Sequence, residues 1–423
     1  MRHEIDAVQT AAGDQVVLGD GRPDCDDDPV TGFFGDPSPG SVQATDPTTL
    51  ERLFGHADGL LPLWIAEPYV PLAAPIVDAL ERRARSGWYG YEIRPPSVIE
   101  AFWRWAGARH RWDGSDLATE VSPSVGTSIA VLIDLVTEPG DGVIVQPPVF
   151  TDFKPIVRAS GRTVVTNPLL LGDGGYTMDL DDLTAKAADP ATRMLILCNP
   201  HNPVGRVWRA AELEAVARIC AEHDVVVVSD EIHGDLALAP YRFVPFGEVA
   251  PGSGVRWAAT HGPLKTFGLA GVCDTLLVTG DEAIRDGFRA MSSRLHLARN
   301  NVFGLAAFEA AYRAGGPWLE GMLELVSGNL QLLDQELPDP IGLMPIEGTY
   351  LAWLDLRSLG LDVPELTRWL ADEARLALSP GHWFGRQGAG FARMSIAVAR
   401  PVVAEALDRL TAAVERLDRR RRT

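Results

Sequence analysis

The feature that most constrains the fold is a series of short apolar runs separated by segments with helical spacing. The runs are rich in β-branched residues, and one of them, 225–228, is four consecutive valines. The others lie at 141–146, 194–198 and 275–278, and segments with helical spacing lie at 97–110, 128–136 and 210–223. Unbroken apolar strands that alternate with helices are typical of a parallel sheet covered on both faces. The sequence from about residue 97 therefore predicts an α/β domain.

Two polar segments directly follow predicted strands. Asn199 to Gly205 follows the run at 194–198, and Ser229 to His233 follows the four valines. Ligands of parallel sheets bind beyond the carboxyl ends of the strands. We therefore expect functional side chains in these two segments.

The pattern changes after about residue 309. A long helical stretch, Ala307 to Leu333, leads into a proline-rich turn, and a run at 349–356 alternates as a strand with one exposed face does. A helix at 364–375, a β-like run at 392–398 and a last helix that begins near Pro401 follow. Residues 309–423 therefore predict a smaller α+β domain.

The first 45 residues are rich in Asp, Gly, Pro and Thr, which predicts a partly flexible N-terminal arm. They contain no apolar stretch like that of a signal peptide, and no later run approaches the length of a membrane helix. The four cysteines are scattered without a CxxC pair. This spacing favours reduced thiols in a cytoplasmic protein over disulfides or a zinc site.

The formal net charge of −19 argues against nucleic acid or an anionic membrane as a partner, because both would be repelled. The basic run Arg419 to Arg422 is expected to be a solvated helix end. A small molecule is the expected partner.

Four motifs occur in a characteristic order. They are Asn199-Pro200-His201-Asn202-Pro203-Val204-Gly205, Ser229-Asp230-Glu231-Ile232-His233, Pro263-Leu264-Lys265-Thr266-Phe267-Gly268-Leu269-Ala270-Gly271 and Phe391-Ala392-Arg393-Met394-Ser395. In this order they resemble the class I and II aminotransferases of fold type I, whose signature is NPxNPxG. Within this family, the chain resembles the MalY/PatB-type cystathionine β-lyases over residues 40 to 416. This narrower resemblance rests on Trp64-Ile65-Ala66, Tyr89-Gly90-Tyr91, Asp-Glu-Ile-His and Lys-Thr-Phe.

The resemblance implies pyridoxal 5′-phosphate (PLP) as the cofactor and fold type I as the α/β architecture. The large domain, 96–308, would hold a mostly parallel seven-stranded sheet flanked by helices, and 309–423 would be the smaller α+β domain. Segment 46–95 would contribute to the small domain and to the interface of a homodimer. No metal is expected.

PLP chemistry requires a lysine, a carboxylate at the pyridine nitrogen and a donor at the ring O3′. By resemblance, Lys265 would hold the cofactor as a Schiff base and shuttle the substrate proton. Asp230 would pair with the pyridinium nitrogen, Asn202 would bond O3′, and His233 would lie close by. Each of these three residues also has a structural interpretation: Asp230 as a helix cap, Asn202 as a turn residue and His233 as a core histidine.

The phosphate, the ring face and the substrate have their own candidates. Gly126, Thr127 and Ser128 open an apolar helix, whose terminal amides suit a phosphate. By resemblance, Phe150 would stack on the ring, or else belong to the core. Tyr91 would reach the phosphate of the neighbouring subunit, or else serve in packing. Arg393 would bind the substrate carboxylate as a bidentate fork, or else form a structural salt bridge.

The sequence also departs from the lyase pattern. Leu264 stands where the family has a Ser or Thr that binds phosphate, so Thr260 or His261 would compensate, or the phosphate would be held more weakly. Phe150 replaces a more usual Tyr, and Gly268 replaces Asn. Segment 64–69 reads Trp-Ile-Ala-Glu-Pro-Tyr instead of Trp-Val-Ala-Asp-Met-Asp, which suggests a different or larger substrate.

Three functional hypotheses follow. The first is a PLP-dependent C–S β-lyase that converts an S-substituted L-cysteine to thiol, pyruvate and ammonia in secondary metabolism, such as antibiotic biosynthesis. The second is the same site acting as an aminotransferase or as a decarboxylating oxidative deaminase of a cysteine conjugate. The third is a PLP-binding regulator without turnover, against which the intact set of Lys265, Asp230, Asn202 and Arg393 argues.

Overall fold

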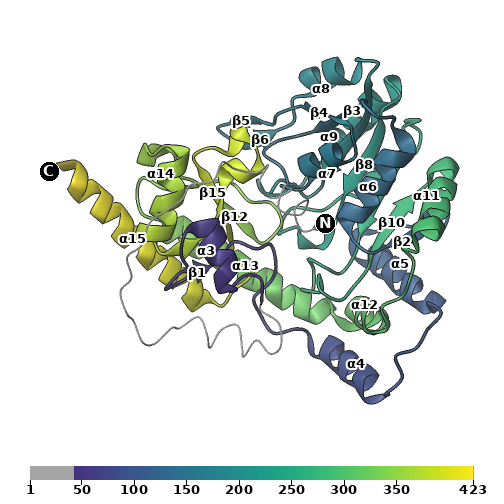
Figure 1. The fold of residues 1–423 in the computed structure, drawn as a ribbon, viewed down its shortest axis with the longest axis horizontal. Coiled ribbons are helices and arrows are strands. Elements are labelled where there is room, and N and C mark those ends of the chain that lie inside the picture. Colours follow the sequence, from purple (N-terminus) through teal and green to yellow (C-terminus); the bar gives the residue numbers. More distant parts are fainter. Residues whose placement is uncertain (1–41, 423) are drawn as a thin grey trace. The chain divides into compact units, whose positions relative to one another are not determined.

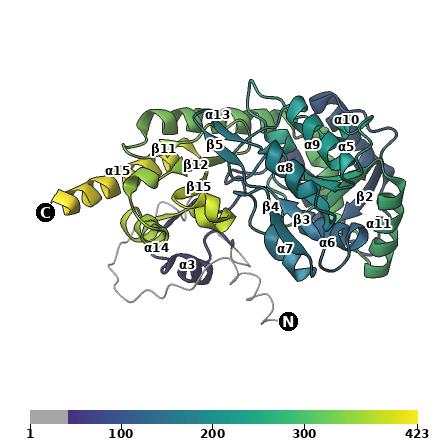
Figure 2. The ribbon, with the colours of Figure 1, turned by 90° about the horizontal axis from the view of Figure 1, so that it is seen from above.

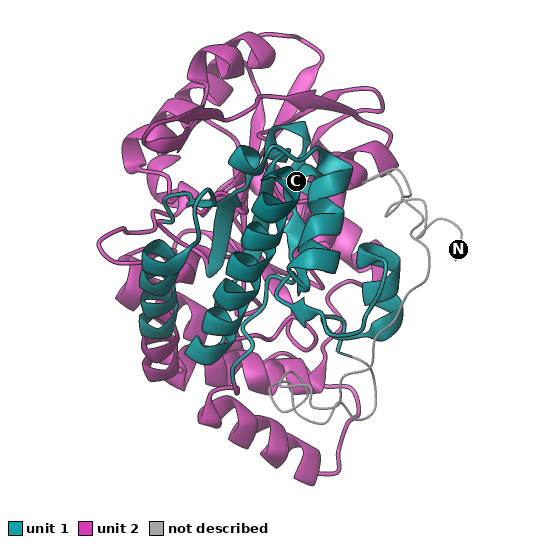
Figure 3. Ribbon diagram, turned by 90° about the vertical axis from the view of Figure 1, so that its left-hand side faces the viewer, with its two compact units in different colours: residues 1–70, 324–346, 350–423 teal, residues 71–323, 347–349 magenta. Residues whose placement is uncertain are grey.

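The computed structural model describes residues 42–422, which divide into two compact units (Figure 3). Within the described residues, unit 1 comprises 42–70, 324–346 and 350–422, and unit 2 comprises 71–323 and 347–349. The expected arm, 1–45, lies almost wholly outside the described residues. The unit boundaries differ from the expected ones at 96 and 309, and the chain passes from unit 2 into unit 1 within α13 (Gly316–Glu336).

Unit 2 is built on a sheet that has seven strands within the described residues. Its order is β2 (Ala118–Ser122), β10 (Thr275–Thr279), β9 (Trp257–His261), β8 (Val226–Asp230), β7 (Thr192–Cys198), β3 (Gly142–Val145) and β4 (Thr163–Thr166). The strands from β9 to β4 are parallel, whereas β10 runs antiparallel to both of its neighbours. The predicted mostly parallel sheet is confirmed, and each predicted strand matches an observed one.

Helices cover both faces of this sheet (Figures 1 and 2). One face carries α6 (Val125–Val136), α7 (Phe153–Ala159) and α11 (Glu282–Leu295). The other carries α8 (Leu180–Ala187), α9 (Ala210–Glu222) and α10 (Phe246–Val249). Three further helices of unit 2 pack together: α4 (Ala74–Arg85), α5 (Pro96–His110) and α12 (Val302–Ala314). A small hairpin joins β5 (Leu170–Gly172) to β6 (Gly175–Thr177).

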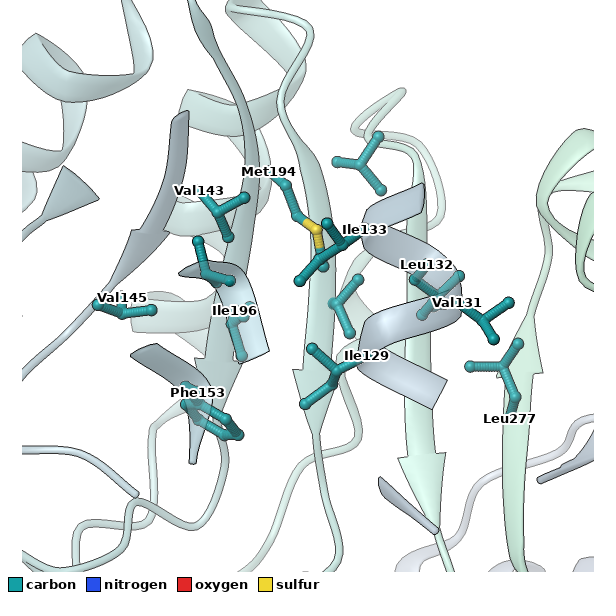
Figure 4. Packing of buried hydrophobic residues seen from close by; sticks show 14 of the residues in the cluster. Ile129, Val131, Leu132, Ile133, Val143, Val145, Phe153, Met194, Ile196 and Leu277 are labelled. Atoms are coloured by element: carbon teal, nitrogen blue, oxygen red, sulfur yellow. The ribbon is translucent and has the colours of Figure 1, made fainter. Parts of the chain in front are cut away.

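The core under the α6 face explains why the strands are apolar throughout. Figure 4 shows Ile129 and Ile133 of α6 among side chains of the sheet, including Met194 and Ile196 of β7. All four side chains, and Phe153 of α7, are fully buried. Each such burial stabilises the fold by about 1.5–3 kcal/mol. This continuous apolar layer holds the strand ends in a fixed arrangement.

The predicted helical stretch at 307–333 is helical, but a break divides it into two helices. The first, α12, ends at Ala314, and α13 begins at Gly316. Between them, a side chain on Gly315 would collide with Phe267 and with the Ala311 carbonyl. Pro317 then lacks the backbone N–H that a continuous helix would use. The sequence Gly-Gly-Pro is therefore a break that helical periodicity alone does not reveal.

Unit 1 is an α+β unit, as predicted. Its antiparallel sheet has the order β11 (Gly342–Leu343), β12 (Leu351–Asp355), β15 (Phe391–Ser395) and β14 (Ser379–Pro380). A parallel pair joins β1 (Leu61–Pro62) to β13 (Leu376–Ala377). The remaining helices are α3 (Pro47–Phe54), α14 (Val363–Arg368) and α15 (Arg400–Arg422). The basic run at the end of α15 is exposed, as expected.

Three further predictions concern cysteines, membranes and metals. Cys198, Cys220 and Cys273 are buried free thiols, and Cys25 lies outside the described residues. Among residues 42–422, no helix combines the length and apolar character needed to span a bilayer. The same residues contain no cluster of three or more His, Cys, Asp or Glu that could hold a metal ion.

Candidate active site

The candidate site lies in unit 2, at the carboxyl ends of β7, β8 and β9. Asp230 is the last residue of β8 and is 5% exposed. One carboxylate oxygen accepts hydrogen bonds from the Ile232 amide at 3.2 Å and from the Thr260 hydroxyl at 3.1 Å. Burial raises the pKa of Asp230 to about 6, although these two bonds and the charge of Lys265 oppose the rise. Asp230 is therefore a buried acid that is ionised at neutral pH.

The loop that follows β9 carries Lys265, which is partly buried. The loop is compact, because the Phe267 amide bonds the Pro263 carbonyl at 2.9 Å and the Leu269 amide bonds the Leu264 carbonyl at 3.0 Å. Gly268 has φ +70°, a left-handed conformation that Gly and Asn tolerate best. This explains how Gly can stand where the family has Asn. Because β8 and β9 pair in parallel, this loop begins beside Asp230.

Asn202 and His233 lie on the two loops that flank this position. Asn202 follows β7 and is 3% exposed, and its amide N–H points at Cys198 Sγ, 3.5 Å away. His233 follows β8 and is also 3% exposed. Residues Cys198 and Asp230 are register partners, so the two loops start side by side. The structure thus brings Asp230, Lys265, Asn202 and His233 to one edge of the sheet, as predicted from the sequence.

His201 connects the Asn202 loop to the loop that carries Phe150. Its Nε2 lies 2.9 Å from the Pro148 carbonyl, which can only accept a hydrogen bond. Burial lowers the pKa of His201 to about 4, so the ring is neutral and Nε2 is the protonated nitrogen. Phe150 is partly buried beside the core and meets Phe153 edge to face, with ring centroids 5.5 Å apart. The expected ring-stacking residue therefore packs against Phe153 and lies two residues after a carbonyl that His201 binds.

The first turn of α6 has the features of an anion site. Ser124 caps the helix, and its Oγ accepts from the Thr127 amide at 3.0 Å. Amides of a first helical turn have no partner within the helix, and the helix dipole favours an anion there. Ser128 is fully buried, and its hydroxyl bonds no group among the described residues. Gly126, Thr127 and Ser128 thus belong to a helix start that suits an anion, in which the Thr127 amide bonds Ser124 Oγ and the Ser128 amide bonds the Ser124 carbonyl at 3.1 Å. Sequence reasoning missed Ser124, although a Ser three residues before Thr127 is a cap signal.

The proposed compensation for Leu264 by Thr260 does not fit the hydrogen bond that Thr260 makes. The Thr260 hydroxyl donates to Asp230, and His261 Nε2 lies 3.3 Å from Glu231 Oε2. Burial lowers the pKa of His261 to about 3 and raises that of Glu231 to about 8, so both groups are neutral at pH 7. The Thr260 hydroxyl is therefore bonded to Asp230, whereas His261 Nε2 makes no hydrogen bond among the described residues. Leu264 itself is buried.

Two further expected site residues come from other parts of the chain. Tyr91, in the segment between α4 and α5, is 91% exposed, and its ring centroid lies 5.4 Å from the Arg299 guanidinium. Arg393 belongs to unit 1 and is 6% exposed. Its Nη2 donates to the Trp64 carbonyl at 2.8 Å and to Ser379 Oγ at 3.2 Å. Burial lowers the pKa of Arg393 to about 10, so it stays charged at neutral pH.

The residues of unit 2 fit PLP. A helix N-terminus with a buried, unbonded Ser128 hydroxyl suits the phosphate. A buried, ionised Asp230 suits the pyridinium nitrogen, and Lys265 is near enough to lower the pKa of Asp230. These groups come from three different segments that meet at one sheet edge, which is where ligands of such sheets bind.

Comparison with known proteins identifies the family. Residues 76–410 match the model of the family described as aminotransferase class I and II. The cystathionine beta-lyase PatB of Bacillus subtilis is 36% identical over 86% of this chain and 94% of its own.

Solved structures give the same result. The crystal structure of a PLP-bound protein from Clostridium difficile 630 has a TM-score of 0.84 and 34% identity, covering 90% of this chain and 99% of its own. Cystalysin from Treponema denticola, which contains PLP, has a TM-score of 0.80 and 29% identity over 85% of this chain and 92% of its own. This chain therefore belongs to the aminotransferase class I and II family, in the branch that contains PatB.

Proposed function

We propose that this chain is a PLP-dependent carbon–sulfur β-lyase that converts an S-substituted L-cysteine to a thiol, pyruvate and ammonia. The observation that carries the proposal is that Asp230 ends β8 and Lys265 lies in the loop after the adjacent strand β9, close enough for the lysine charge to act on the carboxylate. The relatives that bear the name cystathionine beta-lyase support the choice of reaction.

The chain's own residues then have defined roles. When bound, PLP supplies an electron sink that acidifies the substrate Cα–H bond. Asp230 keeps a proton on the ring nitrogen, for which its carboxylate must be ionised. The Lys265 amine removes the Cα proton, the Cβ–S bond breaks, and the thiolate leaves with the bond's electron pair. The resulting enamine takes up one water molecule and gives pyruvate and ammonia. Arg393 is assigned to the substrate carboxylate.

A second candidate rests on Phe150. A phenylalanine keeps the aromatic face that can cover the cofactor ring, but it has no hydroxyl with which to move a proton. Without that group, the same site favours transamination or a decarboxylating oxidative deamination of the cysteine conjugate. These reactions share the cofactor and differ in which bond at Cα is oriented for cleavage.

Product analysis separates the candidates. The holoenzyme is incubated with S-methyl-L-cysteine, S-benzyl-L-cysteine and L-cystathionine, with and without a keto-acid acceptor and oxygen. Equal amounts of thiol, pyruvate and ammonia, with no need for acceptor or oxygen, support the lyase. A product keto acid that retains sulfur and requires an acceptor would instead identify a transaminase. Carbon dioxide release with oxygen uptake would identify the oxidative route.

The setting of the enzyme is also part of the proposal. The unusual segment Trp64 to Tyr69 supports a substrate other than that of a general cystathionine lyase, and thus a place in secondary metabolism. Three buried free thiols support a reducing, cytoplasmic compartment.

We further propose a homodimer, with Tyr91 reaching the phosphate of the second subunit. The segment between α4 and α5 exposes large apolar side chains: Trp88 at 72%, Tyr89 at 54%, Tyr91 at 91% and Ile93 at 91%. Such a group is typical of a covered interface. Light scattering should give twice the chain mass. Mixing Tyr91→Ala with Lys265→Ala should restore activity, because one site of the mixed dimer would contain both native residues. Failure to regain activity would contradict a shared site.

A further inference from the structure

A buried hydrogen bond attaches the lysine loop to the neighbouring β8 loop. Thr266, which directly follows Lys265, is fully buried, and its Oγ1 donates to Asp235 Oδ2 at 2.9 Å. Asp235 lies five residues after Asp230, in the short helical turn Gly234–Leu236. The bond therefore joins the loop that carries the lysine to the loop that carries Asp230.

The acceptor is itself firmly held. Asp235 Oδ1 accepts from Trp105 Nε1 at 2.8 Å and lies 2.8 Å from His110 Nε2. The Arg109 guanidinium donates to the Asp235 carbonyl at 3.1 Å, with its Nε 3.7 Å from Oδ1. All three partners lie on α5, which makes Asp235 a fixed point between the two loops and this helix.

The residue after Thr266 is held by apolar packing. The Phe267 ring is fully buried among aromatic rings, with centroids 5.8 Å from Trp105, 6.3 Å from Tyr312 and 5.8 Å from Trp318. Trp105 therefore contacts both groups that hold the loop, because its Nε1 donates to Asp235 and its ring packs on Phe267. The backbone just after Lys265 is thus fixed by the hydrogen bond of Thr266 and by the apolar packing of Phe267.

We infer that Asp235 is a positioning residue, which fixes the Lys265 amine relative to Asp230 by binding the Thr266 hydroxyl. The inference rests on the proposed role of Lys265. It also accounts for Leu264, since a loop anchored through the residue after the lysine does not depend on a phosphate contact from the residue before it. A displacement of about 1 Å at the reacting amine costs about 100-fold in rate, so this bond matters for turnover.

The test compares Thr266→Val, which removes only the hydroxyl, with Thr266→Ser, which restores it. In the full-length holoenzyme, hydrogen exchange of peptides covering 262–270 should rise about 10-fold or more in Thr266→Val, as expected for the loss of a bond to a buried charged group. The kcat should fall about 100-fold while KM changes little. Thr266→Ser should return both quantities to near their wild-type values.

Thr279→Val is the matched control. Thr279 is equally buried and donates to the Trp257 carbonyl at 2.6 Å, at the opposite end of β9 from the lysine loop. It should lower the melting temperature without changing the exchange of 262–270 or kcat.

Asp235→Ala tests the same bond from its other side. The double variant Thr266→Val/Asp235→Ala should be no worse than Asp235→Ala alone, because Asp235→Ala has already removed the acceptor of the Thr266 hydroxyl.

Two results would overturn the inference: wild-type exchange of 262–270 in Thr266→Val, or a Thr266→Ser variant that fails to recover kcat. The exchange measurement needs no substrate, so it stays informative even if S-substituted cysteines prove not to be the substrates and the proposed function fails.

Discussion

Glu231→Gln offers a sharp test of how the β8 loop is built. The Glu231 side chain is fully buried, and Oε1 accepts from the Phe246 amide at 2.7 Å and from Ser229 Oγ at 2.8 Å. Oε2 lies 3.3 Å from His261 Nε2. A protonated carboxyl fits these contacts, with Oε1 as the acceptor of both hydrogen bonds and the proton on Oε2, which makes no hydrogen bond among the described residues. Glutamine has the same shape and the same pattern of acceptor and donor.

The expected change in the free energy of unfolding with pH follows from the pKa of Glu231. Burial raises this pKa from 4.5 to about 8, so the folded state favours the protonated form. A carboxyl whose pKa is higher in the folded state than in the unfolded state makes its full contribution to stability below about pH 4.5. This contribution is lost as the pH rises through about 8. At about 1.4 kcal/mol per pH unit, the wild type should lose about 3 kcal/mol between pH 5 and pH 8 through this residue alone. The amide introduced by Glu231→Gln does not titrate, so the free energy of unfolding of the variant should not fall in this way between pH 5 and pH 8.

Urea denaturation of holoenzyme at pH 5, 6, 7 and 8 measures the effect. The free energy of unfolding of Glu231→Gln should rise relative to wild type by about 3 kcal/mol between pH 5 and pH 8. Glu214→Gln, on the exposed side of α9, is the control and should track the wild type at every pH. A constant difference between Glu231→Gln and wild type across this range would refute the assignment of a neutral, buried carboxyl.

Three further predictions concern the site and the core. Arg393→Lys should raise KM for the amino acid about 100-fold, because an ammonium group cannot make the two-pronged bond of a guanidinium; an unchanged KM would remove Arg393 from substrate binding. Thr260→Val removes a donor that lowers the pKa of Asp230, so the acid limb of the kcat/KM profile should move to higher pH by up to about 1 unit, and a limb that stays in place would count against this bond. Phe153→Ala should cost about 3–5 kcal/mol in urea unfolding while leaving KM unchanged, and a cost below about 1 kcal/mol would contradict the packing seen in the α6 face.

Much of the fold could be predicted from the sequence, because a fully covered parallel sheet leaves a strong local signal. The strands at 192–198 and 226–230 are buried along nearly their whole length, so they appear as plain apolar runs. The break between α12 and α13 could not be found in this way. It depends on the close approach of Phe267 to Gly315, a contact between residues far apart in the sequence.

The candidate site, like the fold, could be predicted only in part from the sequence. Asp230, Lys265 and Asn202 stand in motifs; Asp230 is the last residue of a strand, and the other two lie in loops that follow strands. Asp235, Trp105 and His110 belong to no motif, because their common function arises from where α5 meets the β8 loop. The sequence suggests Thr260 as a phosphate ligand, and only the register of β8 against β9 reveals that its hydroxyl bonds Asp230.

The central claim is that Lys265 removes a proton from an S-substituted L-cysteine so that the Cβ–S bond breaks. The most direct test measures thiol and pyruvate released from S-methyl-L-cysteine by the wild type and by Lys265→Ala at matched PLP content. The wild type should release the two products in equal amounts, and Lys265→Ala should be slower by about 1,000-fold or more. A variant that keeps the wild-type rate, or a wild type that releases thiol without pyruvate, would contradict the claim.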